Sequence, residues 1–247
     1  MKKEKVLQAL VAVAVTAVVI LGPSQALATT CLPTLTGAPY SYDLQQTNDP
    51  VAGTSHVTMA ALSSAIPAGF GGFDPSATTS FGQDFTLGAT VTWSSGTELG
   101  LAARANPSQM NFYYAGFNPI NNYFALVQIV GGTEITNLDT ANLAGAITSG
   151  QAWDITLTVD GSSLAATLSQ GGSPLASLSY TDTQDAEYPG DPVFSDGQCG
   201  VFMFKKSLDT ISGEWSNAYI VPEPATLGLL LLGALGIVAR ARKGRVL

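Results

Sequence analysis

The sequence has 247 residues, of which 46% are hydrophobic and 11% are charged, and its formal net charge is −8 at pH 7. Most basic residues lie at the two ends: between Thr29 and Ile220 the chain has three basic and sixteen acidic residues, a net charge of −13. This excess of acidic side chains argues against binding to nucleic acid or to anionic lipid, because both need clustered cations.

The N-terminus has the three parts of a secretory signal peptide. Lys2, Lys3 and Lys5 precede an apolar run over residues 6–21, Gly22-Pro23 ends that run, and Ala26-Leu27-Ala28 supplies small residues at the cleavage positions. We therefore predict a signal peptide over residues 1–28, cleaved after Ala28, and export through the Sec machinery.

The C-terminal residues 221–247 form a second targeting segment. The motif residues Val221, Pro222, Glu223 and Pro224 precede an apolar run over 225–239, which is followed by the basic residues Arg240, Arg242, Lys243 and Arg245. As a helix, fifteen residues extend about 22 Å, less than the roughly 30 Å of a bilayer core, which suits a transient stop. The basic cluster would stay in the cytoplasm and leave the preceding domain outside.

This order of elements resembles the PEP-CTERM sorting signal of bacterial envelope proteins. The resemblance implies insertion in the inner membrane through the tail helix, removal of that helix by an exosortase, and a final location in the cell envelope, at the surface or outside the cell. It also implies a bacterium that makes a polysaccharide matrix. A permanent single-pass anchor remains the alternative.

Residues 29–220 are predicted to form one all-β domain, because short runs of alternating apolar and polar residues are separated by Gly, Pro, Asn and Asp. The predicted strands are 84–93, 98–104, 111–117, 123–130, 134–138, 153–159, 163–169, 175–180, 199–204 and 212–220. Turns are predicted at Asp160-Gly161, Gly131-Gly132 and Gly171-Gly172, and a short helix over 140–147. So many strands in one domain favour a two-sheet antiparallel sandwich or jelly roll.

Five segments of this domain carry a second resemblance. They are Gly100 to Arg104, Phe112-Tyr113-Tyr114, Tyr123 to Val127, Gly131 to Leu138 and Trp153 to Gly161. Together they resemble the concanavalin A-like (laminin G-like) jelly roll. That resemblance implies a fold and no single function, because lectins, adhesion modules and glycosidases share it.

The exported part contains two cysteines, Cys31 and Cys199. Export places them in an oxidising compartment, so we predict a disulfide between them that brings the first strand close to a late one. Two buried thiols are the alternative.

Aromatic residues with polar neighbours in the middle of the domain suggest a glycan-binding surface. The residues expected to contact a glycan are Arg104, Asn111, Tyr113, Tyr114 and Asn122. Aromatic rings offer apolar faces to sugars. Packing of the same rings in the core is the competing interpretation.

An acidic segment near the end of the domain is a candidate Ca²⁺ site. Its carboxylates are Asp182, Asp185, Glu187, Asp191 and Asp196, on a stretch rich in Gly and Pro. Ca²⁺ prefers six to eight oxygen ligands, which such a loop can supply. The alternative is a solvated acidic loop.

The sequence lacks the catalytic patterns of this fold and of common hydrolases. No strand carries the Glu-x-Asp-x-x-Glu pattern that would place two carboxyl groups on one face for a retaining glycosidase. No Gly-x-Ser-x-Gly accompanies the single histidine, His56. We therefore expect a non-enzymatic protein with a structural or carbohydrate-binding role. The alternative is a carbohydrate-active enzyme with a non-standard site, for which Asp185 and Glu187 are the one close pair.

Overall fold

The computed structural model describes residues 30–32, 35–38, 42–61, 68–73, 84–95, 98–106, 109, 111–131, 134–143, 147–183, 194, 197–205 and 211–222. Within these ranges, no residue belongs to a helix that could span a membrane. The predicted signal peptide and the predicted tail helix lie outside the described residues.

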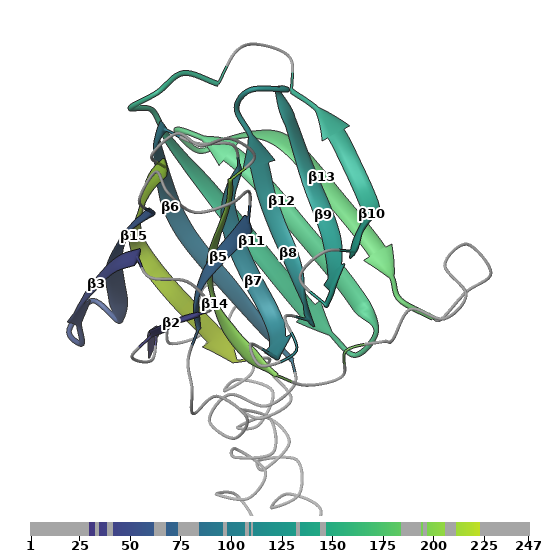
Figure 1. Cartoon of the computed structure of the whole chain (residues 1–247), viewed down its shortest axis with the longest axis horizontal. Coiled ribbons are helices and arrows are strands. Elements are labelled where there is room, and N and C mark those ends of the chain that lie inside the picture. The colour runs from purple at the N-terminus through teal and green to yellow at the C-terminus, as the bar shows by residue number, and fades with distance from the viewer. Residues whose placement is uncertain are drawn as a thin grey trace, which may run out of the picture.

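The described residues form fifteen β-strands in two antiparallel sheets that pack face to face (Figure 1). The larger sheet, sheet A, has the order β13-β12-β11-β6-β15-β4-β3, with β1 also paired to β15, and the other, sheet B, has the order β10-β9-β8-β7-β14-β5-β2. The strands are β1 Thr30–Cys31, β2 Thr36–Ala38, β3 Tyr42–Asp49, β4 Thr54–Ala61, β5 Ala68–Phe73, β6 Phe85–Ser95, β7 Glu98–Asn106, β8 Asn111–Asn118, β9 Tyr123–Val130, β10 Glu134–Asn142, β11 Ala152–Asp160, β12 Ser163–Gln170, β13 Ser173–Thr181, β14 Gln198–Lys205 and β15 Ile211–Pro222. The predicted all-β sandwich is confirmed.

Glycines fix the register of two hairpins in sheet A. Asp160 pairs with Ser163 around a two-residue turn that begins at Gly161, whose φ is 55°. Gln170 pairs with Ser173 around Gly171 and Gly172, which both have positive φ. Such turns need left-handed residues, which glycine adopts without steric cost, so these two predicted turns are confirmed.

Alternating side chains of both sheets build the central core. On β11, Trp153, Ile155, Leu157 and Val159 are buried while the residues between them are half-buried. Trp215 of sheet A is completely buried, and its indole Nε1–H donates to the Gly100 carbonyl oxygen of sheet B at 2.9 Å. This hydrogen bond ties the two sheets together across the core.

The helix predicted over residues 140–147 is wrong in its first turn. Thr140, Ala141 and Asn142 belong to β10 and pair with β9 after a bulge between Asn137 and Asp139. Pairing with a complete neighbouring strand satisfies these backbone groups, whereas a one-turn helix would gain little from its local propensity.

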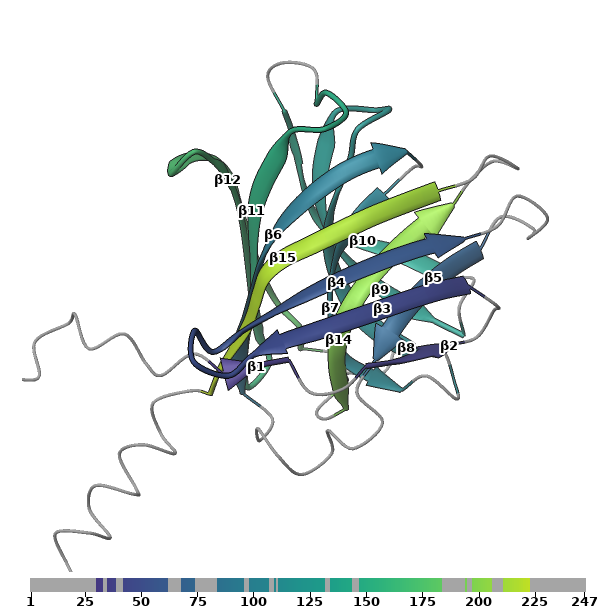
Figure 2. The same cartoon turned by 90° about the vertical axis from the view of Figure 1, so that its left-hand side faces the viewer.

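The first and last strands meet at one corner of sheet A. In β1, Thr30 pairs with Ile220 and Cys31 with Tyr219 (Figure 2). Cys199 is buried on β14 in the opposite sheet. The Cys31 side chain lies outside the described part of the structure, so the Cys31–Cys199 disulfide stays a prediction.

Candidate functional site

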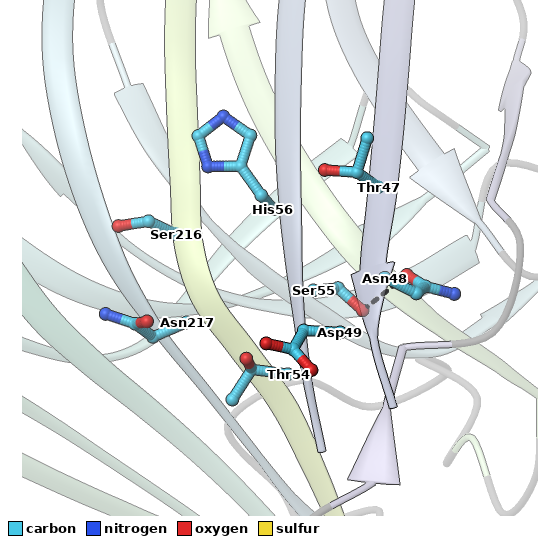
Figure 3. Close-up of a pocket in the computed structure, with 8 residues that line it drawn as sticks. All are labelled: Thr47, Asn48, Asp49, Thr54, Ser55, His56, Ser216 and Asn217. Carbon is cyan, nitrogen blue, oxygen red and sulfur yellow. Dashed lines mark hydrogen bonds between the residues drawn. The ribbon is translucent and has the colours of Figure 1, made fainter. Parts of the chain in front are cut away.

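A polar hollow of about 180 Å³ lies on the outer face of sheet A, where β3, β4 and β15 run side by side (Figure 3). The residues that line it are Thr47, Asn48, Asp49, Thr54, Ser55, His56, Ser216 and Asn217. All eight carry a polar side chain. The hollow therefore offers hydroxyl, carboxamide and carboxylate groups to a ligand that makes many hydrogen bonds.

Hydrogen bonds inside the fold hold the floor of this hollow in place. The Leu32 N–H donates to Ser55 Oγ, and Ser55 Oγ donates to Asn48 Oδ1, both at 2.8 Å. Asp49 Oδ1 accepts the backbone N–H groups of Val51 and Ala52 in the turn between β3 and β4. Ser55 is 2% exposed and so supports the floor from below, whereas the Asp49 carboxylate is held in place before a ligand arrives, which lowers the entropic cost of binding.

A second hollow of about 140 Å³ continues from the first across β15, β6 and β11. It is lined by Ala89, Thr90, Asp154, Ile155, Thr156, Asn217 and Tyr219. Thr90 Oγ1 donates to Asp154 Oδ1 at 2.8 Å, which fixes that carboxylate at the edge of the hollow. Asn217 lines both hollows, so they adjoin at this residue. We call the two hollows together the groove; the five strands under it extend about 19 Å at ordinary strand spacing.

Tyr219 supplies the aromatic surface of the groove. Its ring lies over Gly88, the residue directly opposite on β6. A Cβ added to Gly88 would come within 2.3 Å of Tyr219 Cζ, so the absence of a side chain there makes room for the ring. Tyr219 is half-buried, which leaves part of its side chain for a ligand.

A β-bulge turns Tyr219 outward. The register of β15 shifts between Trp215 and Ala218 against β4 and between Ser216 and Tyr219 against β6. Asn217 within this bulge has a φ of 50°, the left-handed conformation that Asn tolerates better than most residues. Because the bulge adds one residue to β15, the alternation of inward and outward side chains shifts by one position. Ala218 and Ile220 therefore face the core and Tyr219 faces the groove.

The side chains that line the groove include two carboxylates and are otherwise mostly uncharged. The ionisable residues of the groove are Asp49, His56, Asp154 and Tyr219, and no lysine or arginine is among the residues that line it. His56 Nδ1 also lies 3.7 Å from Glu214 Oε1 beside the groove. A polyanionic ligand would meet like charges here, whereas an uncharged polyhydroxylated ligand would not.

The five predicted glycan-contacting residues do not form one exposed surface. Tyr113 points into the central core and Tyr114 into a second cluster with Phe112 and Phe202 on the other face of sheet B. Both rings and Arg104 are at most 2% exposed. The central strands β7, β8 and β9 are buried on both faces, so Tyr113 and Tyr114 serve packing.

The two predicted asparagines stabilise turns. Asn111 Oδ1 accepts the Gly131 N–H at 2.8 Å, and Asn122 Oδ1 accepts the Ile147 N–H at 3.2 Å. Asn122 has a φ of 53°.

Arg104, Tyr113 and Asp182 meet at one end of the sandwich. Arg104 Nη1 donates to the Phe194 carbonyl oxygen at 3.0 Å, and Arg104 Nη2 lies 3.2 Å from Asp84 Oδ1. The Tyr113 hydroxyl donates to Asp182 Oδ2 and accepts the Phe194 N–H. We call Asp84, Arg104, Tyr113, Asp182 and Phe194 the end cluster. It holds residues 182 and 194 on either side of the acidic segment.

Burial raises the pKa of three tyrosines in sheet B. For Tyr113 the hydrogen bond to Asp182 adds to the effect of burial, and for Tyr114 the nearby Glu98 carboxylate does. The pKa of Tyr123 rises to about 12, through burial and its hydrogen bond to Glu98 Oε1 at 2.5 Å. All three therefore stay protonated at physiological pH and act as hydrogen-bonding or packing groups.

Of the five acids in the predicted Ca²⁺ segment, the structure describes Asp182 alone. That residue is 8% exposed and its Oδ2 already accepts the Tyr113 hydroxyl. Within the described ranges, no three His, Cys, Asp or Glu side chains gather as a metal site would require. Asp185, Glu187, Asp191 and Asp196 lie outside those ranges, and Ca²⁺ binding there stays a prediction.

Residues 221–243 match the family model of the PEP-CTERM protein-sorting motif. No curated protein sequence matches the chain. The structure is similar to the carbohydrate-binding module CBM66 from Bacillus subtilis, with 13% sequence identity, a TM-score of 0.54 and coverage of 78% of this chain and 99% of the module. It is also similar to arcelin-5, a lectin-like defense protein from Phaseolus vulgaris, with 12% identity, a TM-score of 0.47 and coverage of 76% and 91%. The sorting motif and the jelly-roll fold predicted from the sequence are both confirmed.

Proposed function

Because the chain joins a PEP-CTERM sorting motif to a lectin-like jelly roll, we propose that it is an exported envelope protein that binds an uncharged polysaccharide in the groove of sheet A. Its tail would be removed by an exosortase, and the sandwich would then remain in the cell envelope, at the surface or in the surrounding matrix. The sorting motif supports export, since such motifs are carried by proteins that cross the inner membrane.

The observation that carries the binding proposal is the groove around Tyr219 and Asn217. An aromatic ring beside fixed carboxylate, carboxamide and hydroxyl groups suits sugars, which have apolar ring faces and polar edges. The length of the groove across five strands suits a segment of a chain better than a single sugar. The similar Bacillus subtilis structure is a carbohydrate-binding module, which adds support through the shared fold.

We further propose that the protein has no enzymatic activity. The groove holds Asp154 with one oxygen already bound by Thr90 Oγ1, and Asp49 with one oxygen bound by two backbone N–H groups. These hydrogen bonds hold both carboxylates in place, and no strand carries the Glu-x-Asp-x-x-Glu pattern of a retaining glycosidase. These two acids are thus suited to accept hydrogen bonds from sugar hydroxyls.

Affinity electrophoresis tests this function. Residues 29–222 expressed alone should be retarded in gels that contain at least one uncharged polysaccharide, and added salt should leave the retardation unchanged. Acidic polysaccharides should not retard the protein, because the domain is strongly acidic. Retardation by acidic polymers alone, no retardation in any gel, or release of reducing sugar during the assay would each contradict the proposal.

A further inference from the structure

The first two residues of the sorting motif belong to the folded sandwich. Strand β15 extends through Val221 and Pro222, and the sorting motif begins at Val221. Val221 pairs with Thr86 and Pro222 pairs with Phe85 on β6. The folded strand thus continues two residues past the domain boundary predicted at residue 220.

Strand β15 is an interior strand of sheet A, between β6 and β4. Where its pairing with β4 ends at Ala218, β1 takes the place of β4 and pairs with Tyr219 and Ile220. Tyr219 and Ile220 therefore have a paired strand on each side, while Val221 and Pro222 pair with β6 alone (Figure 2).

Side-chain packing fastens the same end of β15. Ala218 and Ile220 are completely buried, and Tyr219 lies over Gly88. Beyond β1, Leu32 is 2% exposed and its N–H is bonded to Ser55 Oγ. Pulling Tyr219 or Ile220 out of the sheet would expose this apolar surface and break pairing with two strands.

Proteases commonly bind their substrates as extended strands, so a peptide already paired in a sheet must leave the sheet before it can be cut. We propose that the folded sandwich restricts tail removal to peptide bonds on the C-terminal side of Pro222. Val221 and Pro222 then remain as the end of β15 in the mature protein. The pairing of β1 with Tyr219 and Ile220, the two residues before them, keeps this end of β15 in the sheet. This inference rests on the tail removal proposed above.

The chemistry of the cut is ordinary acyl transfer. The amide C–N bond after Pro222, or after one of the next residues, breaks. The carbonyl carbon forms a new bond to the oxygen of water, or to a hydroxyl or amine of an envelope acceptor. The departing tail keeps the amide nitrogen as a new amino group and takes up the proton that the nucleophile loses.

Intact-mass measurement of the mature protein tests the position of the cut. The full-length precursor is expressed together with an exosortase, and the mature form is expected to end at Pro222, Glu223 or Pro224. A mature protein that ends at Val221 or earlier would overturn this inference and leave the proposed processing intact. A protein that keeps its whole tail would overturn the proposed processing and this inference with it.

Limited proteolysis tests the protection of β15 without the exosortase. Protein that begins at Thr30 and retains its tail in detergent should be trimmed by a broad-specificity protease to Pro222 or beyond. A matched protein that begins at Leu32 lacks β1, and trimming into residues 219–222 should become about tenfold faster, because two pairs of cross-strand backbone contacts are lost. Equal trimming of the two proteins would show that β1 does not lock β15.

Discussion

Replacement of Arg104 by leucine is expected to lower the free energy of unfolding by about 2 to 3 kcal/mol. Arg104 is 2% exposed, and its guanidinium donates to the buried Phe194 carbonyl oxygen while it pairs with Asp84. Leucine has no donor, so this carbonyl group would stay buried without its partner. The loss should appear as a lower midpoint in urea denaturation with an unchanged m-value.

Two matched variants separate the parts of this effect. Asp84→Asn weakens the ion pair, but the Asp84 side chain is 41% exposed and the expected loss stays below about 1 kcal/mol. Arg104→Lys keeps the charge but lacks the planar group that reaches two acceptors at once, so an intermediate loss is expected. If Asp84→Asn destabilises as much as Arg104→Leu, the Phe194 contact is not the main contribution.

Replacement of Tyr219 by alanine is expected to weaken binding to an uncharged polysaccharide about tenfold, the equivalent of about 1.4 kcal/mol. The ring of Tyr219 is the aromatic surface of the groove, and a sugar packed on it would lose that contact. Tyr219→Phe keeps the ring and should retain most of the affinity. The measurement is the mobility of each variant in affinity gels over a range of polysaccharide concentrations.

Gly88→Ala tests the same surface without removing the ring. The new Cβ would lie 2.3 Å from Tyr219 Cζ, so the ring has to leave its position over β6. A similar loss of affinity is expected. Ser177→Ala, on exposed β13 of the same sheet and outside both hollows, is the control. Full binding by Tyr219→Ala and Gly88→Ala would place the polysaccharide elsewhere on the protein.

The sequence predicted the ten strands after residue 84 and missed the five before it, including β4, whose alternation is clear. Each of the ten predicted strands overlaps an observed one, from β6 to β15. Strand β5, Ala68–Phe73, contains three glycines, and β3, Tyr42–Asp49, is a mostly polar strand at the edge of sheet A. Glycines and polar residues at a sheet edge do not alternate between apolar and polar side chains. These two strands form because they pair with neighbouring strands, which the sequence pattern does not show.

The groove could not be predicted from alternation, because a bulge reverses the pattern in β15. Counting by twos from the buried Trp215 places Asn217 and Tyr219 in the core, whereas the bulge turns both outward. Asn217 is the one local signal, since Asn adopts left-handed conformations more readily than most residues. Without the pairing to β4 and β6, the sequence does not show that this asparagine has a positive φ.

The glycan-contacting residues were predicted in sheet B because aromatic residues are dense there. Tyr113 and Tyr114 point to opposite faces of β8, as neighbours on a strand must, yet both faces are buried. Alternation distinguishes the two faces of a strand and does not tell whether the second face is covered. The outer face of sheet A has fewer aromatic residues and carries the open groove.

A titration of isotope-labelled residues 29–222 with an uncharged oligosaccharide, followed by backbone amide chemical shifts, tests the central claim most directly. We predict that the largest shift changes fall in the turn between β3 and β4, at Ser216 to Tyr219, and at the neighbouring positions Thr90 and Asp154 to Thr156. Saturable shift changes confined to sheet B or to the end cluster would contradict the proposed binding groove.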